Sequence, residues 1–257
     1  GTEYHLTKND GENNLHSGLD FYHGRLWKVA DADDTHVTFE MDSPDGDQGY
    51  PGALVMKVTY SLDEENTLMI HYEAEPDQDT IINMTNHSYF NLNGHKSGDV
   101  LNHTLWLNAD AFTPADAASI PTGEIRSVEG TPMDFRIDKT IGKDIEADYE
   151  PLVFGKGYDH NWVLKNEGEF DKVAEVAGDE SGIHMSVLTD LPGVQIYTAN
   201  FLDGVKGRDG AVYEMRDAIC LETQYYPDAI HHENFPGPIC KKGEKYDTRT
   251  AYRFRVK

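Results

Sequence analysis

Short runs of β-branched and apolar residues, several of them alternating with polar residues, recur along the whole chain, and helical spacing is scarce. Runs of this kind between polar turns are typical of β-strands. The pattern predicts strands at residues 24–29, 36–41, 53–62, 67–74, 80–84, 101–107, 161–164, 173–177, 184–189, 194–198 and 251–256.

The segments 53–62 and 67–74 are joined by four polar residues and predict a β-hairpin. The segment 80–84 follows directly and predicts a strand that carries His87 at its end or just past it. Sequence neighbours of this kind usually pair in an antiparallel sheet. We therefore expect an all-β fold, a β-sandwich whose function is carried by strand ends and loops.

Residues 108–160 hold four prolines and little regular pattern. A connection of this length is unusual in a compact domain unless its loops line a site. No internal repeat and no linker of distinct composition interrupts the 257 residues, so we expect one domain over residues 1–257.

The charge is strongly unbalanced, with 46 acidic against 22 basic residues and a formal net charge of -24. Such a surface repels nucleic acids and anionic membranes, so we expect neither as a partner. The same excess argues against a phosphorylated substrate, because phosphate recognition relies on clustered Arg or Lys.

Two cysteines, Cys220 and Cys240, are too few for a disulfide scaffold, and their context suggests no zinc site. No secretory hydrophobic region opens the chain, and no apolar run approaches the length that crosses a bilayer. We expect a soluble, cytoplasmic protein.

The polar cluster of residues 85–92 centres on His87. An imidazole has an ordinary pKa of about 6.5 and suits general acid catalysis on a substrate oxygen. The alternative is a hydrogen-bonded structural histidine beside the aromatic residues that follow it.

Three further residues are candidates for the same site. His16 lies in a turn-rich loop, Asp159 lies in a polar segment that leads into a strand, and Glu222 directly follows an apolar segment. The alternatives are a solvated histidine, a turn or capping aspartate, and a solvated or ion-paired glutamate.

Two segments invite a metal interpretation that we do not adopt. Residues 42–49 lack the ligand spacing and terminal glutamate of a calcium loop and predict a tight connection. The adjacent His231 and His232 point apart in most backbones, and no convergent carboxylate accompanies them in the sequence. We expect no metal site.

Taken together, several motifs along the chain resemble the galactose mutarotases, also called aldose 1-epimerases. The resemblance covers essentially the whole chain, and so many motifs in family order rarely arise by chance. The matching segments are 15–18, 43–49 with 51–52, 85–91, 121–125, 130–135, 158–161, 194–198, and 222–224 with 227–229.

This resemblance implies a large antiparallel β-sandwich that interconverts the α and β anomers of free aldoses without a cofactor. It implies that Glu222 is the general base and His87 the general acid. His16, Asp159 and Gln195 are then the hydrogen-bonding partners of the sugar. The residue types suit the chemistry, because opening a pyranose removes a proton from the anomeric hydroxyl and delivers another to the ring oxygen.

The chain departs from the family pattern at its start. Family members carry several strands before the segment that matches Leu15 and His16, including an Asn-Arg pair whose arginine helps to bind the sugar. A sandwich that lacks strands exposes an unpaired edge and apolar core surface. We therefore expect either a complementing N-terminal segment or reduced stability. Ser17 also stands where the family commonly has glycine.

Two other functions stay open at this point. One is a related epimerase of hexose 6-phosphates, which a basic cluster beside the pocket would favour. The other is a carbohydrate-binding sandwich that has lost catalysis, which binding without turnover would reveal.

Overall fold

The computed structural model describes all residues from Gly1 to Lys257. Its internal contacts divide the chain into two compact units, and each unit is described by itself. The first unit comprises Gly1–Asp63, Leu68–Asn83 and Pro238–Thr248, and the second comprises Glu64–Thr67, Met84–Gly237 and Arg249–Lys257.

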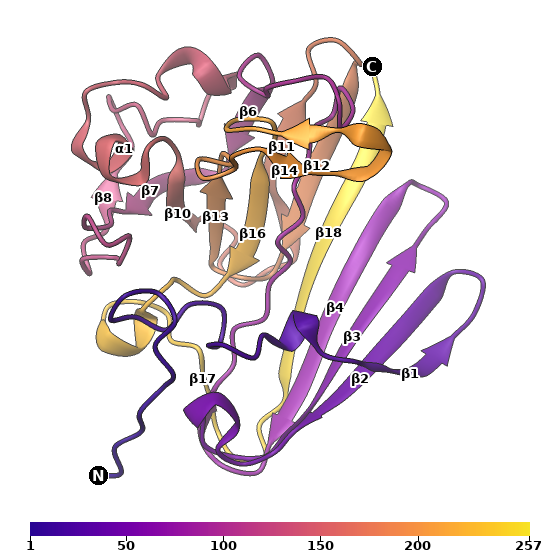
Figure 1. The fold of residues 1–257 in the computed structure, drawn as a ribbon, viewed down its shortest axis with the longest axis vertical. Coiled ribbons are helices and arrows are strands. Elements are labelled where there is room, and N and C mark those ends of the chain that lie inside the picture. The colour runs from indigo at the N-terminus through magenta and orange to yellow at the C-terminus, as the bar shows by residue number, and fades with distance from the viewer. The chain divides into compact units, whose positions relative to one another are not determined.

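The first unit is built on four consecutive antiparallel strands, β1 to β4, which Figure 1 draws in indigo to magenta. Hydrophobic and polar residues alternate in these strands, as expected for a sheet. A separate two-stranded ladder joins β5 to β17. The strands are β1 (Lys28–Ala32), β2 (His36–Ser43), β3 (Leu54–Leu62), β4 (Thr67–Pro76), β5 (Thr80–Ile81) and β17 (Ile239–Cys240).

The second unit contains two larger sheet regions, and Figure 1 shows their central strands in neighbouring layers. In one region the order is β18-β12-β11-β6-β9, with antiparallel neighbours throughout. Its strands are β6 (Thr104–Leu107), β9 (Lys139–Thr140), β11 (Asp171–Ala177), β12 (Ile183–Thr189) and β18 (Tyr246–Val256), which belongs to this unit from Arg249 onward.

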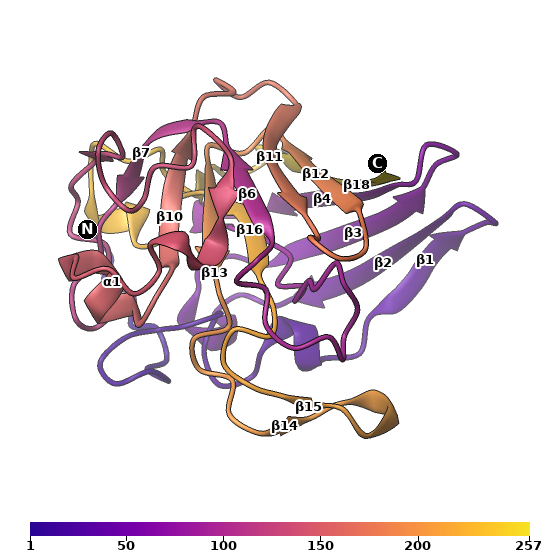
Figure 2. The same cartoon turned by 90° about the horizontal axis from the view of Figure 1, so that it is seen from above.

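The other region of the second unit is a five-stranded antiparallel sheet of order β16-β13-β10-β7-β8. Its strands are β7 (Ala109–Thr113), β8 (Arg126–Ser127), β10 (Asp159–Leu164), β13 (Gly193–Tyr197) and β16 (Cys220–Gln224). The hairpin of β14 (Val205–Lys206) and β15 (Val212–Tyr213) projects beside it in Figure 2.

Helices are few and short. The single α-helix is α1 (Glu150–Gly155), and the remaining helical turns are of the 3-10 type. These are η1 (Tyr22–Gly24), η2 (Asp47–Gly49), η3 (Ile141–Lys143), η4 (Arg208–Gly210) and η5 (Ala229–His231). No helix is both long enough and apolar enough to cross a membrane.

The two sheet regions of the second unit are joined by direct contacts between β16 and β18. The hydroxyls of Thr223 and Thr250 are hydrogen-bonded, and the hydroxyl of Tyr252 donates to the carbonyl oxygen of Leu221. Trp162, which is fully buried, donates its indole N–H to the carbonyl oxygen of Met133. Burying a large apolar side chain contributes about 1.5–3 kcal/mol, so Trp162 stabilises the five-stranded sheet.

The all-β antiparallel fold is confirmed, and so is the hairpin, in which Leu62 lies opposite Leu68. Three local predictions are wrong. The strand predicted at 24–29 overlaps β1 only at Lys28 and Val29, because Gly24 still belongs to the 3-10 turn η1. The strand predicted at 80–84 is only the two residues of β5, which pairs with β17. Residues 108–160 are not an irregular connection, because they contain β7, a strand flanked on both sides by partners. The single domain over residues 1–257 stays a prediction.

Candidate active site

One face of the five-stranded sheet is polar. Directly opposite residues in antiparallel strands place their side chains on the same face. Glu222 on β16 lies opposite Gln195 on β13, which in turn lies opposite Asn161 on β10, and Asn161 lies opposite Thr113 on β7. The pairing therefore brings four polar side chains into one row.

A second row runs beside the first on the same face, because side chains two residues apart in a strand point the same way. In this row Asp159 lies opposite Tyr197, and Tyr197 lies opposite Cys220. Cys220 is fully buried and Glu222 is only 5% exposed. Unpaired polar groups are costly to bury, so a sheet face of this composition is typical of a functional site.

The end of α1 positions Asp159. Pro151 lies in the first turn of this helix, where its missing N–H is tolerated, and Lys156 ends the helix in a left-handed conformation with φ of 53°. Gly157 follows with φ of 128°, and a Cβ there would lie 2.6 Å from the guanidinium of Arg216. A glycine is therefore required where the chain turns into β10.

His87 is held in an irregular segment rather than at the end of a strand. The side chain of Asn86 accepts a hydrogen bond from the backbone N–H of Ser88 at 3.1 Å. Phe90 and Ile219 then exchange both backbone hydrogen bonds, each at 2.9 Å. This isolated bridge fixes the segment next to the beginning of β16, and so brings His87 to Glu222.

The structure brings together four of the five predicted site residues. Nε2 of His87 lies 3.5 Å from Oε1 of Glu222. Nε2 of Gln195 donates to Oδ1 of Asp159 at 2.8 Å. An imidazole and a carboxylate thus share one end of the polar face, with an amide and a second carboxylate beside them.

Burial raises the pKa values of both carboxylic acids. The pKa of Glu222 rises to about 8, chiefly because its charge is desolvated and further because Asp159 is a like charge. The pKa of Asp159 rises to about 6 through desolvation, which the hydrogen bond from Gln195 opposes. No Lys or Arg side chain is paired with either carboxylate in the chain as described. Proton exchange near neutral pH is therefore possible at this site.

Aromatic rings surround the imidazole. The ring of Tyr89 stacks on His87 with centroids 5.2 Å apart, and Tyr197 approaches the same ring edge-on at 5.9 Å. Phe201 stacks on Tyr197 and is 55% exposed. The hydroxyl of Tyr197 accepts a hydrogen bond from the backbone N–H of Phe201 at 3.1 Å. These contacts fix the orientation of the imidazole plane.

Gly193 is the position on this face where a side chain would do most damage. A Cβ there would lie 2.3 Å from Oδ1 of Asn161 and 2.8 Å from the ring of Tyr226. We expect Gly193→Ala to lower the free energy of unfolding by about 1–3 kcal/mol, the usual cost of overpacking. Urea denaturation measures this change. Gly237→Ala is the control, because a Cβ at Gly237 meets nothing within 4 Å, and an equal loss in both variants would contradict the expectation.

His16 belongs to the first unit, where it is exposed and has φ of 50°. Its contact with the sugar stays a prediction.

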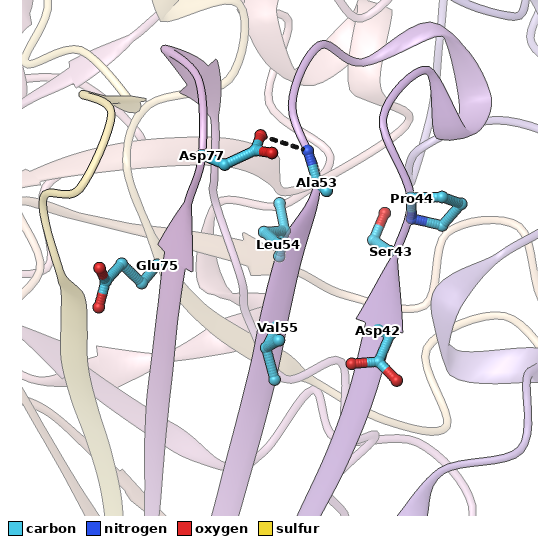
Figure 3. A pocket seen from close by; sticks show the side chains of 8 residues that line it. All are labelled: Asp42, Ser43, Pro44, Ala53, Leu54, Val55, Glu75 and Asp77. Carbon is cyan, nitrogen blue, oxygen red and sulfur yellow. Dashed lines mark hydrogen bonds between the residues drawn. The ribbon is translucent and has the colours of Figure 1, made fainter.

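The first unit also carries an open hollow between β2, β3 and β4, shown in Figure 3. The carboxylates that line it, Asp42, Glu75 and Asp77, are exposed, and no predicted site residue lies there. Exposed carboxylates stay solvated, so this hollow offers no group suited to acid-base catalysis.

The chain matches the family model described as aldose 1-epimerase over residues 1–253. It belongs to the aldose 1-epimerase family. It is 43% identical over 257 residues to the galactose mutarotase of Bos taurus, covering all of this chain and 73% of that protein. It is 38% identical over 252 residues to the aldose 1-epimerase of Escherichia coli K12, covering 97% of this chain and 72% of the relative.

Solved structures of other family members share the fold. A GalM/aldose epimerase homologue from C. elegans superposes on this chain with a TM-score of 0.90 at 31% identity. The superposition covers all of this chain and 76% of the C. elegans chain. A galactose 1-epimerase from Lactobacillus acidophilus superposes with a TM-score of 0.85 at 29% identity. This superposition covers 98% of this chain and 73% of the Lactobacillus chain. The large antiparallel β-sandwich of the family is thus the fold of this epimerase.

Sequence reasoning missed several side chains on the polar face of this family member. Their signal is a spacing of two within strands, which places Asn161 with Asp159, Tyr197 with Gln195, and Cys220 with Glu222. Spacing alone does not reveal which strands are neighbours or in what register, so the rows became visible only through the pairing.

Proposed function

We propose that this protein is an aldose 1-epimerase, an isomerase that interconverts the α and β anomers of free hexoses such as galactose and glucose. The observation that carries the proposal is the pair of His87 Nε2 and Glu222 Oε1, 3.5 Å apart beside a polar sheet face, with the carboxylate buried and the imidazole partly exposed. The anomeric oxygen O1 and the ring oxygen O5 are bonded to the same carbon, so a base and an acid that lie close together can reach both oxygens.

In the proposed reaction Glu222 is the general base and His87 the general acid. The carboxylate of Glu222 takes the proton of the O1 hydroxyl while the C1–O5 bond breaks, and His87 delivers a proton to O5. The product is the open-chain aldehyde. Each of the two residues has exchanged one proton with the sugar, and no oxidant, reductant or cofactor enters the balance.

Closure runs the same steps in reverse after rotation about the C1–C2 bond has presented the other face of the aldehyde. O5 attacks C1, His87 takes back the O5 proton, and Glu222 returns a proton to O1. The open chain must stay bound meanwhile. We assign that task to Asp159, Gln195 and His16, whose polar groups suit hydrogen bonds to sugar hydroxyls.

Polarimetry of freshly dissolved α-galactose and α-glucose tests the proposal. We expect the chain to speed the decay of optical rotation well above the spontaneous rate, and glucose 6-phosphate to be a poorer substrate than glucose. The reason is that Glu222 and Asp159 repel a phosphate ester. Sugar binding by a folded sample without any acceleration would instead favour a non-catalytic carbohydrate-binding protein.

The raised pKa of Glu222 predicts the pH profile. A base acts only when deprotonated and an acid only when protonated, so we expect kcat/KM to pass through a maximum. Glu222, whose pKa is raised to about 8, limits the rate on the acidic side, and loss of the His87 proton lowers the rate on the alkaline side. Titration of Asp159, whose pKa is about 6, adds a weaker inflection. Initial rates between pH 5 and 9 in chelator-treated buffer, corrected for the spontaneous reaction, measure this. A flat profile between pH 5 and 8 would contradict a base with a raised pKa.

Three expectations about partners and location stay predictions. The complementing N-terminal segment is tested by intact mass spectrometry, in which a single folded, monomeric species made of this chain alone would exclude it. The absence of nucleic-acid partners rests on the net charge of -24. The cytoplasmic location rests on Cys220 and Cys240, both of which are free thiols.

A further inference from the structure

A thiol lies directly beside the proposed acid-base pair. Cys220 points to the same sheet face as Glu222, two residues along β16, and it is fully buried. Sγ of Cys220, a ring nitrogen of His87 and a carboxylate oxygen of Glu222 all lie within 4.8 Å of one another. We propose that these three side chains form an inhibitory binding site for a thiophilic divalent cation, for which Zn²⁺ is the model.

The ligand set and its spacing suit such a cation. Zn²⁺ binds sulfur, imidazole nitrogen and carboxylate oxygen at about 2.0–2.3 Å in a tetrahedral arrangement, which puts ligand atoms roughly 3.3–3.8 Å apart. Nε2 of His87 and Oε1 of Glu222 already meet this spacing at 3.5 Å. Sγ of Cys220 lies within 4.8 Å of both other ligand atoms and so has to approach by at most about 1.5 Å, and the fourth position is left to a water molecule.

The surrounding charge also favours a cation. Asp159 lies in the same row of the sheet face as Cys220, and the like charges of Asp159 and Glu222 are not neutralised by a Lys or Arg side chain. A divalent cation would relieve this repulsion. On binding, the sulfur of Cys220 forms a bond to the metal, the thiol proton passes to the buffer, and the cation gives up hydration water.

Occupation of this site must stop catalysis if the proposed function is correct. The metal occupies the lone pairs of His87 and Glu222, so neither side chain can bind or release the protons that the reaction transfers. The inhibition therefore rests on the proposed roles of these two residues, whereas the binding of the metal does not. The two parts can be tested separately.

The other grouping of possible metal ligands in the chain is less suitable. His71, Glu73 and Asp247 in the first unit also lie within 4.8 Å of one another. However, Nζ of Lys245 lies 2.6 Å from Glu73 and 3.1 Å from Asp247. A cation there has to displace an ammonium group that already neutralises both carboxylates, so we expect no tight binding.

Binding is tested with Co²⁺, which reports a thiolate ligand through a sulfur-to-metal charge-transfer band in the near ultraviolet. We expect one equivalent of Co²⁺ to produce the band in the full chain and in Cys240→Ser, and to produce none in Cys220→Ser or Cys220→Ala. Cys240 is a matched control because it is the only other cysteine and is also buried. A band that persists without Cys220, or no band in the unaltered chain, would overturn the proposal.

Inhibition is tested by polarimetry with Zn²⁺, each variant being compared with its own metal-free rate. We expect the unaltered chain and Cys240→Ser to lose activity at the same Zn²⁺ concentration and to recover with a chelator. Cys220→Ser should need at least tenfold more Zn²⁺ for half-inhibition. Equal sensitivity of both cysteine variants would overturn the site. A cobalt band without any loss of turnover would overturn the inhibitory role, and a chain that is inactive without metal would count against the proposed function alone.

Discussion

Replacing Glu222 with glutamine should lower kcat/KM for α-galactose by about 10²–10⁴-fold, the usual contribution of a positioned general base. An amide keeps the shape of the carboxylate but cannot accept the proton of the O1 hydroxyl. Glutamine is close to isosteric with glutamate, so it fits the packed site, where the Glu222 side chain is only 6% exposed. Polarimetric initial rates at pH 8 measure the effect.

The stability of the Glu222→Gln variant separates loss of the base from loss of the fold. The pKa of Glu222 is raised from its ordinary value of 4.5 to about 8, so the folded state binds a proton more tightly than the unfolded state. This contribution to the free energy of unfolding is fully present below pH 4.5 and is lost as the pH rises through 8. We therefore expect the variant to gain stability relative to the unaltered chain above pH 8.

Glu169→Gln is the matched control for that experiment. Glu169 is an exposed glutamate of the same unit, so its replacement should change neither the rate nor the stability appreciably. Undiminished turnover in folded Glu222→Gln would end the assignment of the base.

Replacing His87 with glutamine should lower kcat by a similar factor of about 10²–10⁴. Glutamine can still donate a hydrogen bond to O5, but it cannot transfer a proton there. KM should therefore change much less than kcat. Saturation curves from polarimetry give both constants, and a rise in KM with kcat unchanged would make His87 a binding residue instead.

His231→Gln is the control for this variant, because its side chain is 72% exposed and pairs only with the nearby Asp228. The double variant of Glu222 and His87 adds a further test. Residues that act as one unit are strongly non-additive, so the double variant should cost little more than the worse single one. Fully multiplicative losses would indicate that the two residues act in separate steps.

The fold was largely predictable because alternation of apolar and polar residues survives in most strands. β2, β3, β4, β11 and β12 all lie where the alternation predicts them. β5 did not extend to residue 84, because its partner β17 is two residues long and lies far along the chain. β7 was missed because Ala109–Thr113 is short and rich in alanine, a residue depleted in strands.

The site was predictable in its residues but not in its arrangement. The motifs around His87, Asp159, Gln195 and Glu222 resemble those of a known family, and this resemblance identified the four residues as site residues. Their convergence depends on the order β16-β13-β10 and on the bridge between Phe90 and Ile219. Both are long-range pairings, which local propensity does not encode. The neighbouring Cys220 had no signal beyond its spacing of two from Glu222.

Exchange of magnetisation between the α and β anomeric protons of equilibrated galactose is the most direct test of the proposed chemistry, because it measures ring opening and closure without net conversion. We expect the unaltered chain at pH 8 to produce strong exchange between the two anomers, and Glu222→Gln to return the exchange to the spontaneous rate. Exchange no faster than the spontaneous rate with the folded, unaltered chain, or equal exchange with both proteins, would contradict catalysis by the pair of Glu222 and His87.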